Sequence, residues 1–290
     1  MGQHKLKKKN KGAPPKPKGP TLADKADRHE LYQRAVQAPA ADCEFITRIF
    51  GELRGRAPLR LREDFCGTAL MATTWCQGDP ARSAVGVDLD EATLAWGRAR
   101  NLEPAGAEVA SRVTLVHGDV RAPAPGAPAD VTCAMNFSFC VFKARADLRA
   151  YFEAARRGLA ADGIWIGEIY GGTEAIDVLE EEREVGPYTY VWEQARFDPI
   201  THDTTCHISF RMRDGSKVRH AFTYEWRLWT LPELREALLE AGFREVRFYF
   251  EELAPDEDDP DLLTGTGNFV DTRSLDENQE SWLAYVVALA

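Results

Sequence analysis

The chain has 290 residues, 44% of them hydrophobic, and a formal net charge of −10. This length suits one large domain or two small ones and allows a sizeable core. No apolar run approaches the roughly 20 residues that span a bilayer, and no hydrophobic segment follows the N-terminal lysines, so the sequence predicts neither a membrane span nor a secretory signal.

The charge is unevenly distributed along the chain. Residues 1–20 contain seven lysines and no acid; without these seven, the 36 basic side chains become 29, against 46 acidic ones. We expect residues 1–20 to be a disordered Lys/Pro-rich tail. The tail either solvates the protein or contacts RNA or another polyanion, a contact that the acidic body disfavours.

The six cysteines form no C-x-x-C pair and have no zinc-binding spacing. We therefore expect free and mostly buried thiols, no metal site, and a cytoplasmic location. The cysteines are Cys43, Cys66, Cys76, Cys133, Cys140 and Cys206.

Beyond the tail, helical and strand patterns alternate. Residues 22–37 look helical, and Asp42 can cap a second helix. The apolar side of that second helix consists of Phe45, Ile46, Ile49, Phe50 and Leu53. The predicted strands are 59–64, 83–90, 113–120, 129–137 and 163–170. The predicted helices between them are 69–76, 91–101 and one with Leu148, Tyr151, Phe152, Ala155 and Leu159 on its apolar side. This order predicts a parallel sheet covered on both faces.

The pattern changes after residue 170. Three aromatic-rich runs, 189–197, 205–213 and 217–226, are separated by short turns and predict antiparallel strands. A helix over 232–241 ends at Gly242. A strand over 244–252, an acidic linker over 254–261 and a last strand over 281–290 complete the chain.

The turn LREDFCGTAL, residues 61–70, follows the first strand and precedes a helix. Ligands bind at this end of strands in open α/β sheets. Gly67 allows a ligand close to the backbone, and free amides at the helix start can receive polar groups. A pyrophosphate would need more glycines than this one, so the turn argues against a dinucleotide-dependent dehydrogenase.

In this turn, and at the ends of the next three strands, the sequence resembles class I S-adenosylmethionine-dependent methyltransferases. The first motif of that family commonly reads acidic-x-x-C-G-T-G. The matching residues are Glu63, Cys66, Gly67 and Thr68, with Ala69 at the last glycine and Phe65 at a usually small position. The resemblance covers about residues 40–290. It implies an α/β fold with a Rossmann-like seven-stranded sheet, helices on both faces, and an antiparallel insertion between strands five and six.

The resemblance assigns cofactor contacts to the later motifs. Asp88 ends strand two, where the family's acid binds the two ribose hydroxyls. Asp119 ends strand three, where an acid contacts the adenine amino group, and 136–142 is the fourth motif. Asp88 and Asp90 could instead cap the next helix. The implied cofactor is S-adenosylmethionine, and the implied binding residues are Glu63, Cys66, Gly67, Thr68, Asp88, Leu89, Asp119, Val120 and Asn136.

The insertion, residues 186–228 of a domain over 21–290, resembles the substrate cover of glycine and sugar-amine N-methyltransferases. Its aromatic residues are Tyr188, Tyr190, Trp192, Phe222, Tyr224 and Trp226. They either form a small core or line a pocket, in which Trp192 and Tyr224 could surround a cationic amine.

Glu168 and Tyr170 end strand five and could hold a substrate proton. Arg227, rather than Arg196 or Arg211, is the candidate for binding a substrate carboxylate. These are the catalytic candidates. His117 is expected in the core, and Cys66 is expected to be a buried thiol rather than a nucleophile.

The expected activity is methyl transfer to a small-molecule acceptor, at an amine nitrogen. One alternative is an RNA or protein methyltransferase that uses the tail; nucleic-acid base-amine enzymes carry [D/N]-P-P-[F/Y], whereas residues 136–139 read N-F-S-F. The other alternative is a non-catalytic module that binds S-adenosylmethionine. The sequence does not indicate an oligomeric state.

Overall fold

The computed structural model describes residues 19–255, 263–275 and 277–290. The expected tail therefore lies outside the described residues up to position 18, as does the acidic linker from position 256. Among the described helices, none is both long and apolar enough to cross a membrane.

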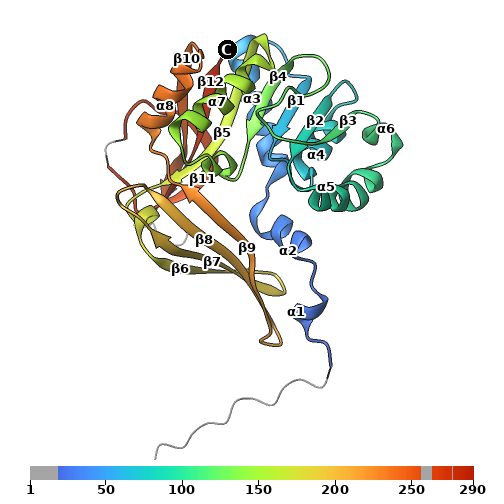
Figure 1. Cartoon of the computed structure of the whole chain (residues 1–290), viewed down its shortest axis with the longest axis vertical. Coiled ribbons are helices and arrows are strands. Elements are labelled where there is room, and N and C mark those ends of the chain that lie inside the picture. Colours follow the sequence, from blue (N-terminus) through green and yellow to red (C-terminus); the bar gives the residue numbers. More distant parts are fainter. Residues whose placement is uncertain (1–18, 256–262, 276) are drawn as a thin grey trace, which may run out of the picture.

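A large mixed sheet forms the body of the protein (Figure 1). Its parallel strands are β1 (Arg60–Asp64), β2 (Ser83–Asp88), β3 (Val113–His117), β4 (Ala129–Ala134) and β5 (Leu159–Gly171). Its antiparallel strands are β10 (Glu245–Pro255), β11 (Leu263–Asp271) and β12 (Trp282–Leu289). The strand order is β11-β10-β12-β5-β4-β1-β2-β3. The sheet thus has eight strands instead of the expected seven, because β11 adds an antiparallel edge strand beside β10.

Helices cover both faces of this sheet, as expected. The helices are α1 (Leu22–Lys25), α2 (Arg28–Val36), α3 (Pro39–Arg54), α4 (Leu70–Gly78), α5 (Glu91–Gly97), α6 (Ala107–Ala110), α7 (Arg145–Arg157) and α8 (Leu231–Glu240). Single turns of other helix types cover Arg98–Leu102, Glu103–Ala105, Ser138–Val141 and Glu174–Ile176. One core contains Ile46 of α3 and Met71 of α4. The other contains Phe152 of α7 and Leu234 of α8. Each core is completed by one face of the sheet, which is the three-layer arrangement of an α/β fold.

A second, antiparallel sheet projects from this body (Figure 1). Its order is β6 (Leu179–Val185), β7 (Tyr188–Phe197), β8 (Asp203–Met212) and β9 (Lys217–Arg227). The three predicted strands are present, and β6 is a fourth that the sequence analysis missed. Helix α2 packs on this sheet through Leu31 and Ala35, which share a core with Tyr188 and Phe210.

Several predicted boundaries are wrong. The expected helix over 22–37 is two helices, because Asp27 leaves the helix and accepts hydrogen bonds from the amides of α2. Asp42 lies in the first turn of α3, not at its cap, and accepts a 2.9 Å hydrogen bond from the Tyr285 hydroxyl. Leu159 belongs to β5 rather than to α7. The acidic linker begins too early, because β10 runs to Pro255.

Strand β1 has an unusual composition for a central strand, since three of its five residues are buried and charged. Arg62 donates from Nε to Asp64 at 2.7 Å and from Nη2 to the carbonyl of Val120. The Tyr151 hydroxyl donates to the other oxygen of Asp64 at 3.1 Å. These charged residues therefore suit a buried strand, because Arg62 and Asp64 pair with each other inside the protein.

Candidate active site

In the turn between β1 and α4, every second residue has a left-handed backbone conformation. Phe65, Gly67 and Ala69 have φ angles of 58°, 51° and 52°. These left-handed values suit glycine, and for other residues they cost roughly 1–2 kcal/mol. The chain therefore adopts a turn with three glycine-type positions although only Gly67 is a glycine.

The carboxylate of Asp88 closes this turn. Gly67 N donates to Oδ2 at 2.7 Å, and Asp90 N donates to Oδ1 at 2.8 Å. Asp90, in contrast, is the N-cap of α5 and accepts from Thr93 N. The capping alternative thus holds for Asp90 but not for Asp88. Since a carboxylate oxygen has two acceptor sites, each Asp88 oxygen keeps one for a ligand.

An apolar side chain stands beside this carboxylate. Leu89 is 68% exposed, an unusual state for a leucine at the end of a central strand. His117 Nε2 lies 3.1 Å from the Leu89 carbonyl oxygen. His117 is exposed, so the expectation of a core histidine was wrong.

Asp119 follows β3, and its carboxylate accepts hydrogen bonds from Arg121. Arg121 donates from its backbone amide, Nε and Nη2 to the two oxygens of Asp119. These bonds lower the pKa of Asp119. Val120 is buried, and its carbonyl accepts from Arg62 at 2.5 Å. The carboxylate of Asp119 therefore has less capacity for a ligand than that of Asp88.

Two motif residues support the turn from beneath. Glu63 is buried and accepts a 2.9 Å hydrogen bond from Ala72 N, and burial raises its pKa to about 8. Cys66 is buried against Gly86, where an added Cβ would lie 2.9 Å from Sγ. Burial raises the pKa of Cys66 well above its ordinary value, so it is the buried thiol that we expected.

Thr68 connects the turn to the N-terminal helices. Its Oγ1 accepts from Gln33 Nε2 of α2 at 2.7 Å, and its carbonyl accepts from Asn101 Nδ2 at 2.9 Å. Helix α2 also lies against the small sheet, where Tyr188 donates to the Leu31 carbonyl at 2.9 Å. One helix thus bridges the glycine turn and the small sheet (Figure 1).

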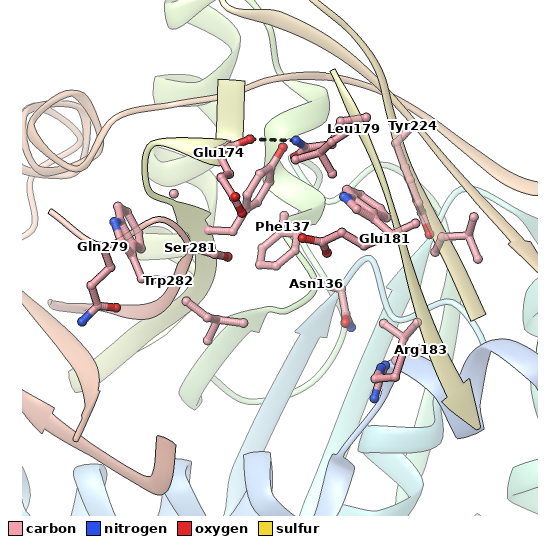
Figure 2. Close-up of a pocket in the computed structure, with 18 of the residues that line it drawn as sticks. Asn136, Phe137, Glu174, Leu179, Glu181, Arg183, Tyr224, Gln279, Ser281 and Trp282 are labelled. Carbon is pink, nitrogen blue, oxygen red and sulfur yellow. Dashed lines mark hydrogen bonds between the residues drawn. The ribbon is translucent and has the colours of Figure 1, made fainter. Parts of the chain in front are cut away.

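A cavity of about 510 Å³ separates the carboxyl edge of the large sheet from the small sheet (Figure 2). Asn136 and Phe137, which follow β4, line it, as does Tyr170 at the end of β5. Asn136 and Phe137 both have left-handed φ angles, of 52° and 59°. The β4 turn therefore stands between the glycine turn of the adjacent strand β1 and this cavity.

Four aromatic side chains form a cluster on the cavity wall. The ring of Phe137 lies 6.1 Å from that of Trp226, which is 4.3 Å from Tyr224. Trp192 lies 6.3 Å from both Tyr224 and Trp226. The aromatic residues of the insertion thus divide between the two expected roles. Tyr188 and Phe222 pack toward α2, and Tyr190, Trp192, Tyr224 and Trp226 line the cavity.

Of the catalytic candidates, Tyr170 reaches the cavity, where its ring is 4.8 Å from Phe137. Burial raises the pKa of Tyr170. Glu168 lies behind the cavity and accepts a 2.7 Å hydrogen bond from Asn136 N. Burial, assisted by the charge of Asp42, raises the pKa of Glu168 to about 7. Glu168 thus holds the β4 turn rather than lining the cavity.

The structure does not bring Arg227 to the cavity. Its Nη2 donates to Glu233 at 2.8 Å, and its guanidinium stacks 3.7 Å from the Trp229 ring centroid. Side chains alternate along a strand, so Arg227 faces away where Trp226 faces inward. Arg196 and Arg211 pair with Asp198 and Glu182 and are also outside the lining.

The missed strand β6 supplies charged residues to the cavity instead. Glu181 and Arg183 occupy alternate positions and line it. Arg183 donates to the carbonyl of Ala35 in α2 and lies 5.4 Å from the Tyr190 ring centroid. The sequence carries little signal for this strand, because residues 179–185 are acid-rich and Val185 is the one typical strand former among them. Within the described part of the chain, no group of three or more His, Cys, Asp or Glu side chains is placed to hold a metal ion.

No family model matches the chain, and no curated protein does. Solved structures do match. An S-adenosylmethionine-dependent methyltransferase from Clostridium acetobutylicum is 16% identical with a TM-score of 0.62, over 89% of this chain and 96% of that one. CalS10, an amino pentose methyltransferase from Micromonospora echinaspora, is 17% identical with a TM-score of 0.60, over 90% of this chain and 95% of that one. The sugar N-methyltransferase KedS8 from a Streptoalloteichus species is 16% identical with a TM-score of 0.58, over 91% of this chain and 92% of that one. The chain therefore has the fold of the S-adenosylmethionine-dependent methyltransferases, as its strand-end motifs indicated.

Proposed function

We propose that the protein binds S-adenosylmethionine and transfers its methyl group to the nitrogen of a small-molecule amine. The observation that carries the proposal is the juxtaposition of two sites at one sheet edge. The glycine turn with Asp88 lies on one side of the β4 turn, and the aromatic cavity lies on the other. Two ligands held there meet beside Asn136 and Phe137.

The residues of the donor side fit the cofactor. The free acceptor sites of the Asp88 carboxylate suit the two ribose hydroxyls. The exposed side chain of Leu89 offers an apolar surface to the adenine ring, and Asp119 lies one strand further along the edge. Phe65 and Ala69 keep the backbone conformation that glycine would adopt, and the ring of Phe65 packs toward Phe142 and Tyr151.

When bound, S-adenosylmethionine supplies a methyl group on a positively charged sulfur, which is activated without help from the protein. The contribution of the chain is to position the acceptor and to exclude water. The small sheet and α2 provide the cover: the expected insertion over 186–228 is extended by β6, and α2 closes the gap to Thr68.

The lining of the cavity favours an amine over a polyanion. Its charged side chains are three glutamates and one arginine. Aromatic rings beside carboxylates attract cations. An RNA backbone would meet like charges instead, which argues against the tail-dependent alternative.

Two measurements test the proposal. Calorimetric titration with S-adenosylhomocysteine tests the donor site, and absence of binding sinks the proposal as a whole. A turnover screen with S-adenosylmethionine against amine, amino-acid and phenol pools, read by product mass, tests the acceptor. Methylation of phenols alone would overturn the assignment of nitrogen while leaving the donor site intact.

A further inference from the structure

We propose that Glu181 makes the cavity selective for an aliphatic amine, which arrives as an ammonium ion and gives one N–H proton to the Glu181 carboxylate before its nitrogen accepts the methyl group and S-adenosylhomocysteine leaves. The inference rests on the proposed function and adds a specificity-determining residue and the chemical class of the acceptor. An alcohol or a weakly basic aromatic amine would not be selected, because neither carries a positive charge at neutral pH.

The strand register places Glu181 beside the aromatic cluster. In the antiparallel pair β6–β7, Glu181 lies directly opposite Trp192. Side chains opposite each other share a face, with Cβ atoms about 4.5–5.5 Å apart. Figure 2 shows the carboxylate directed across the cavity toward Phe137. Glu181 is exposed, and its carboxylate stands between Trp192 of the small sheet and Phe137 of the large sheet.

This combination is what an ammonium ion requires. Ring faces attract a cation through their quadrupoles, most strongly when it is withdrawn from water. A carboxylate adds charge-assisted hydrogen bonds, which fix the N–H directions. Trp192, Tyr224 and Trp226 supply the ring faces, and Glu181 supplies the acceptor oxygens.

The other charged groups of the lining are already hydrogen-bonded or lie on another element. Glu251 accepts a 2.7 Å hydrogen bond from Gly267 N, and Arg183 donates to the carbonyl of Ala35. Glu174 lies on the turn after β5, not on the strand that faces Trp192. Within the described residues, Glu181 makes no side-chain hydrogen bond or ion pair, and it is exposed, so a ligand would replace only water at its carboxylate.

The neighbouring acids of β6 provide matched controls. The side chains of Glu180 and Glu182 lie on the opposite face of the sheet from that of Glu181, because successive side chains alternate along a strand. Glu182 pairs with Arg211, whereas Glu180 lies opposite Glu193. Glu180→Gln therefore removes the same charge from the same strand without touching the cavity.

The test compares cyclohexylamine, an ammonium ion at neutral pH, with cyclohexanol, its uncharged analogue of similar shape. Binding is followed by tryptophan fluorescence with and without S-adenosylhomocysteine. The wild-type chain should bind the ammonium at least about tenfold more tightly, as expected for a charge-assisted hydrogen bond. Glu181→Gln should reduce this preference to less than about threefold, and Glu180→Gln should keep it.

The outcomes separate the two proposals. Equal affinity of the two probes, no binding of the ammonium, or a preference that survives in Glu181→Gln overturns the role of Glu181. If Glu174→Gln loses the preference instead, Glu174 is the residue that binds the ammonium ion, and the role proposed for Glu181 is overturned. Failure of the wild-type chain to bind S-adenosylhomocysteine counts against the proposed function, and the ammonium preference is still measured in its absence. Melting curves and S-adenosylhomocysteine affinities of all variants show that the fold and the donor side are intact.

Discussion

The backbone amide of Gly67 donates a 2.7 Å hydrogen bond to Oδ2 of Asp88, which joins the turn after β1 to the end of β2. The bond orients a carboxylate that a second amide, from Asp90, holds through the other oxygen. A ligand at this edge therefore meets a rigid pair of acceptors, because neither oxygen needs to reorient on binding.

Asp88→Asn should weaken S-adenosylhomocysteine binding more than Asp119→Asn. In the proposed complex Asp88 accepts two charged hydrogen bonds from the ribose, each worth about 1.5–3 kcal/mol, whereas Asp119 is already engaged by Arg121. Calorimetry should show a loss of at least ~10-fold for the first variant beyond that of the second. Asp90→Ala, which removes only a helix cap, is the control, and equal losses for Asp88 and Asp119 would contradict the assigned roles.

Ala69→Gly should be tolerated far better than Ala72→Gly, although both side chains are fully buried. Ala69 has a left-handed φ of 52°, so glycine relieves strain there. Ala72 lies inside α4, where glycine costs about 1 kcal/mol in addition to the lost methyl group. Urea unfolding should separate the two variants by at least ~1 kcal/mol. Equal destabilisation would mean that the turn is not strained.

The stability of the protein should fall as the pH rises toward 8, and Glu63→Gln should reduce this dependence. Burial raises the folded-state pKa of Glu63 from 4.5 to about 8. The folded state thus holds the proton more tightly, so this contribution is fully present below pH 4.5 and is lost as the pH rises through 8. Asp42, Asp64 and Glu168 act in the same direction, since burial raises each of their pKa values.

Unfolding free energies measured from pH 4.5 to 8 check this prediction. The variant should lose ~2–4 kcal/mol less than the wild type over that range. Glu44→Gln, an exposed position on α3, should leave the profile unchanged. A wild-type stability that rises with pH would show that Glu63 is ionised in the folded protein.

Trp192→Leu should weaken acceptor binding and leave donor binding unchanged. The side chain lines the cavity, whereas the glycine turn and Asp88 lie beyond the β4 turn. The Michaelis constant for an amine acceptor should rise at least ~10-fold, while the S-adenosylhomocysteine dissociation constant changes by less than about threefold. Arg227→Gln is the matched control outside the cavity and should change stability alone. A folded Trp192→Leu variant with weakened donor binding and normal acceptor kinetics would refute the division of the site.

Deleting residues 1–18 should leave donor affinity and small-molecule turnover nearly unchanged. The cut stops before Thr21, whose side chain caps α1 through Asp24 N. Gln33→Ala, in contrast, removes the 2.7 Å bond from α2 to Thr68 and should weaken donor binding by ~3- to 10-fold. A tenfold fall in catalytic efficiency on deletion alone would implicate the tail in acceptor binding.

The sequence by itself determined the parallel body of the fold and the candidate donor residues. Both depend on local order: each motif directly follows a strand, and the carboxyl ends of parallel strands meet at one edge. Gly67, Asp88, Asp119 and Asn136 could therefore be placed together without coordinates. The antiparallel insertion was equally predictable, because its aromatic runs alternate and are separated by turns.

Only the tertiary structure decided which residues face the cavity that we propose for the acceptor. A shift of one position turns a side chain to the opposite face of a strand, so Trp226 lines the cavity and Arg227 does not. Strand β6 has an acidic sequence with low strand propensity and forms through its pairing with β7, which is why Glu181 was missed. The handedness of Phe65 and Ala69 was likewise invisible in the sequence, because the surrounding fold imposes a conformation that neither residue prefers.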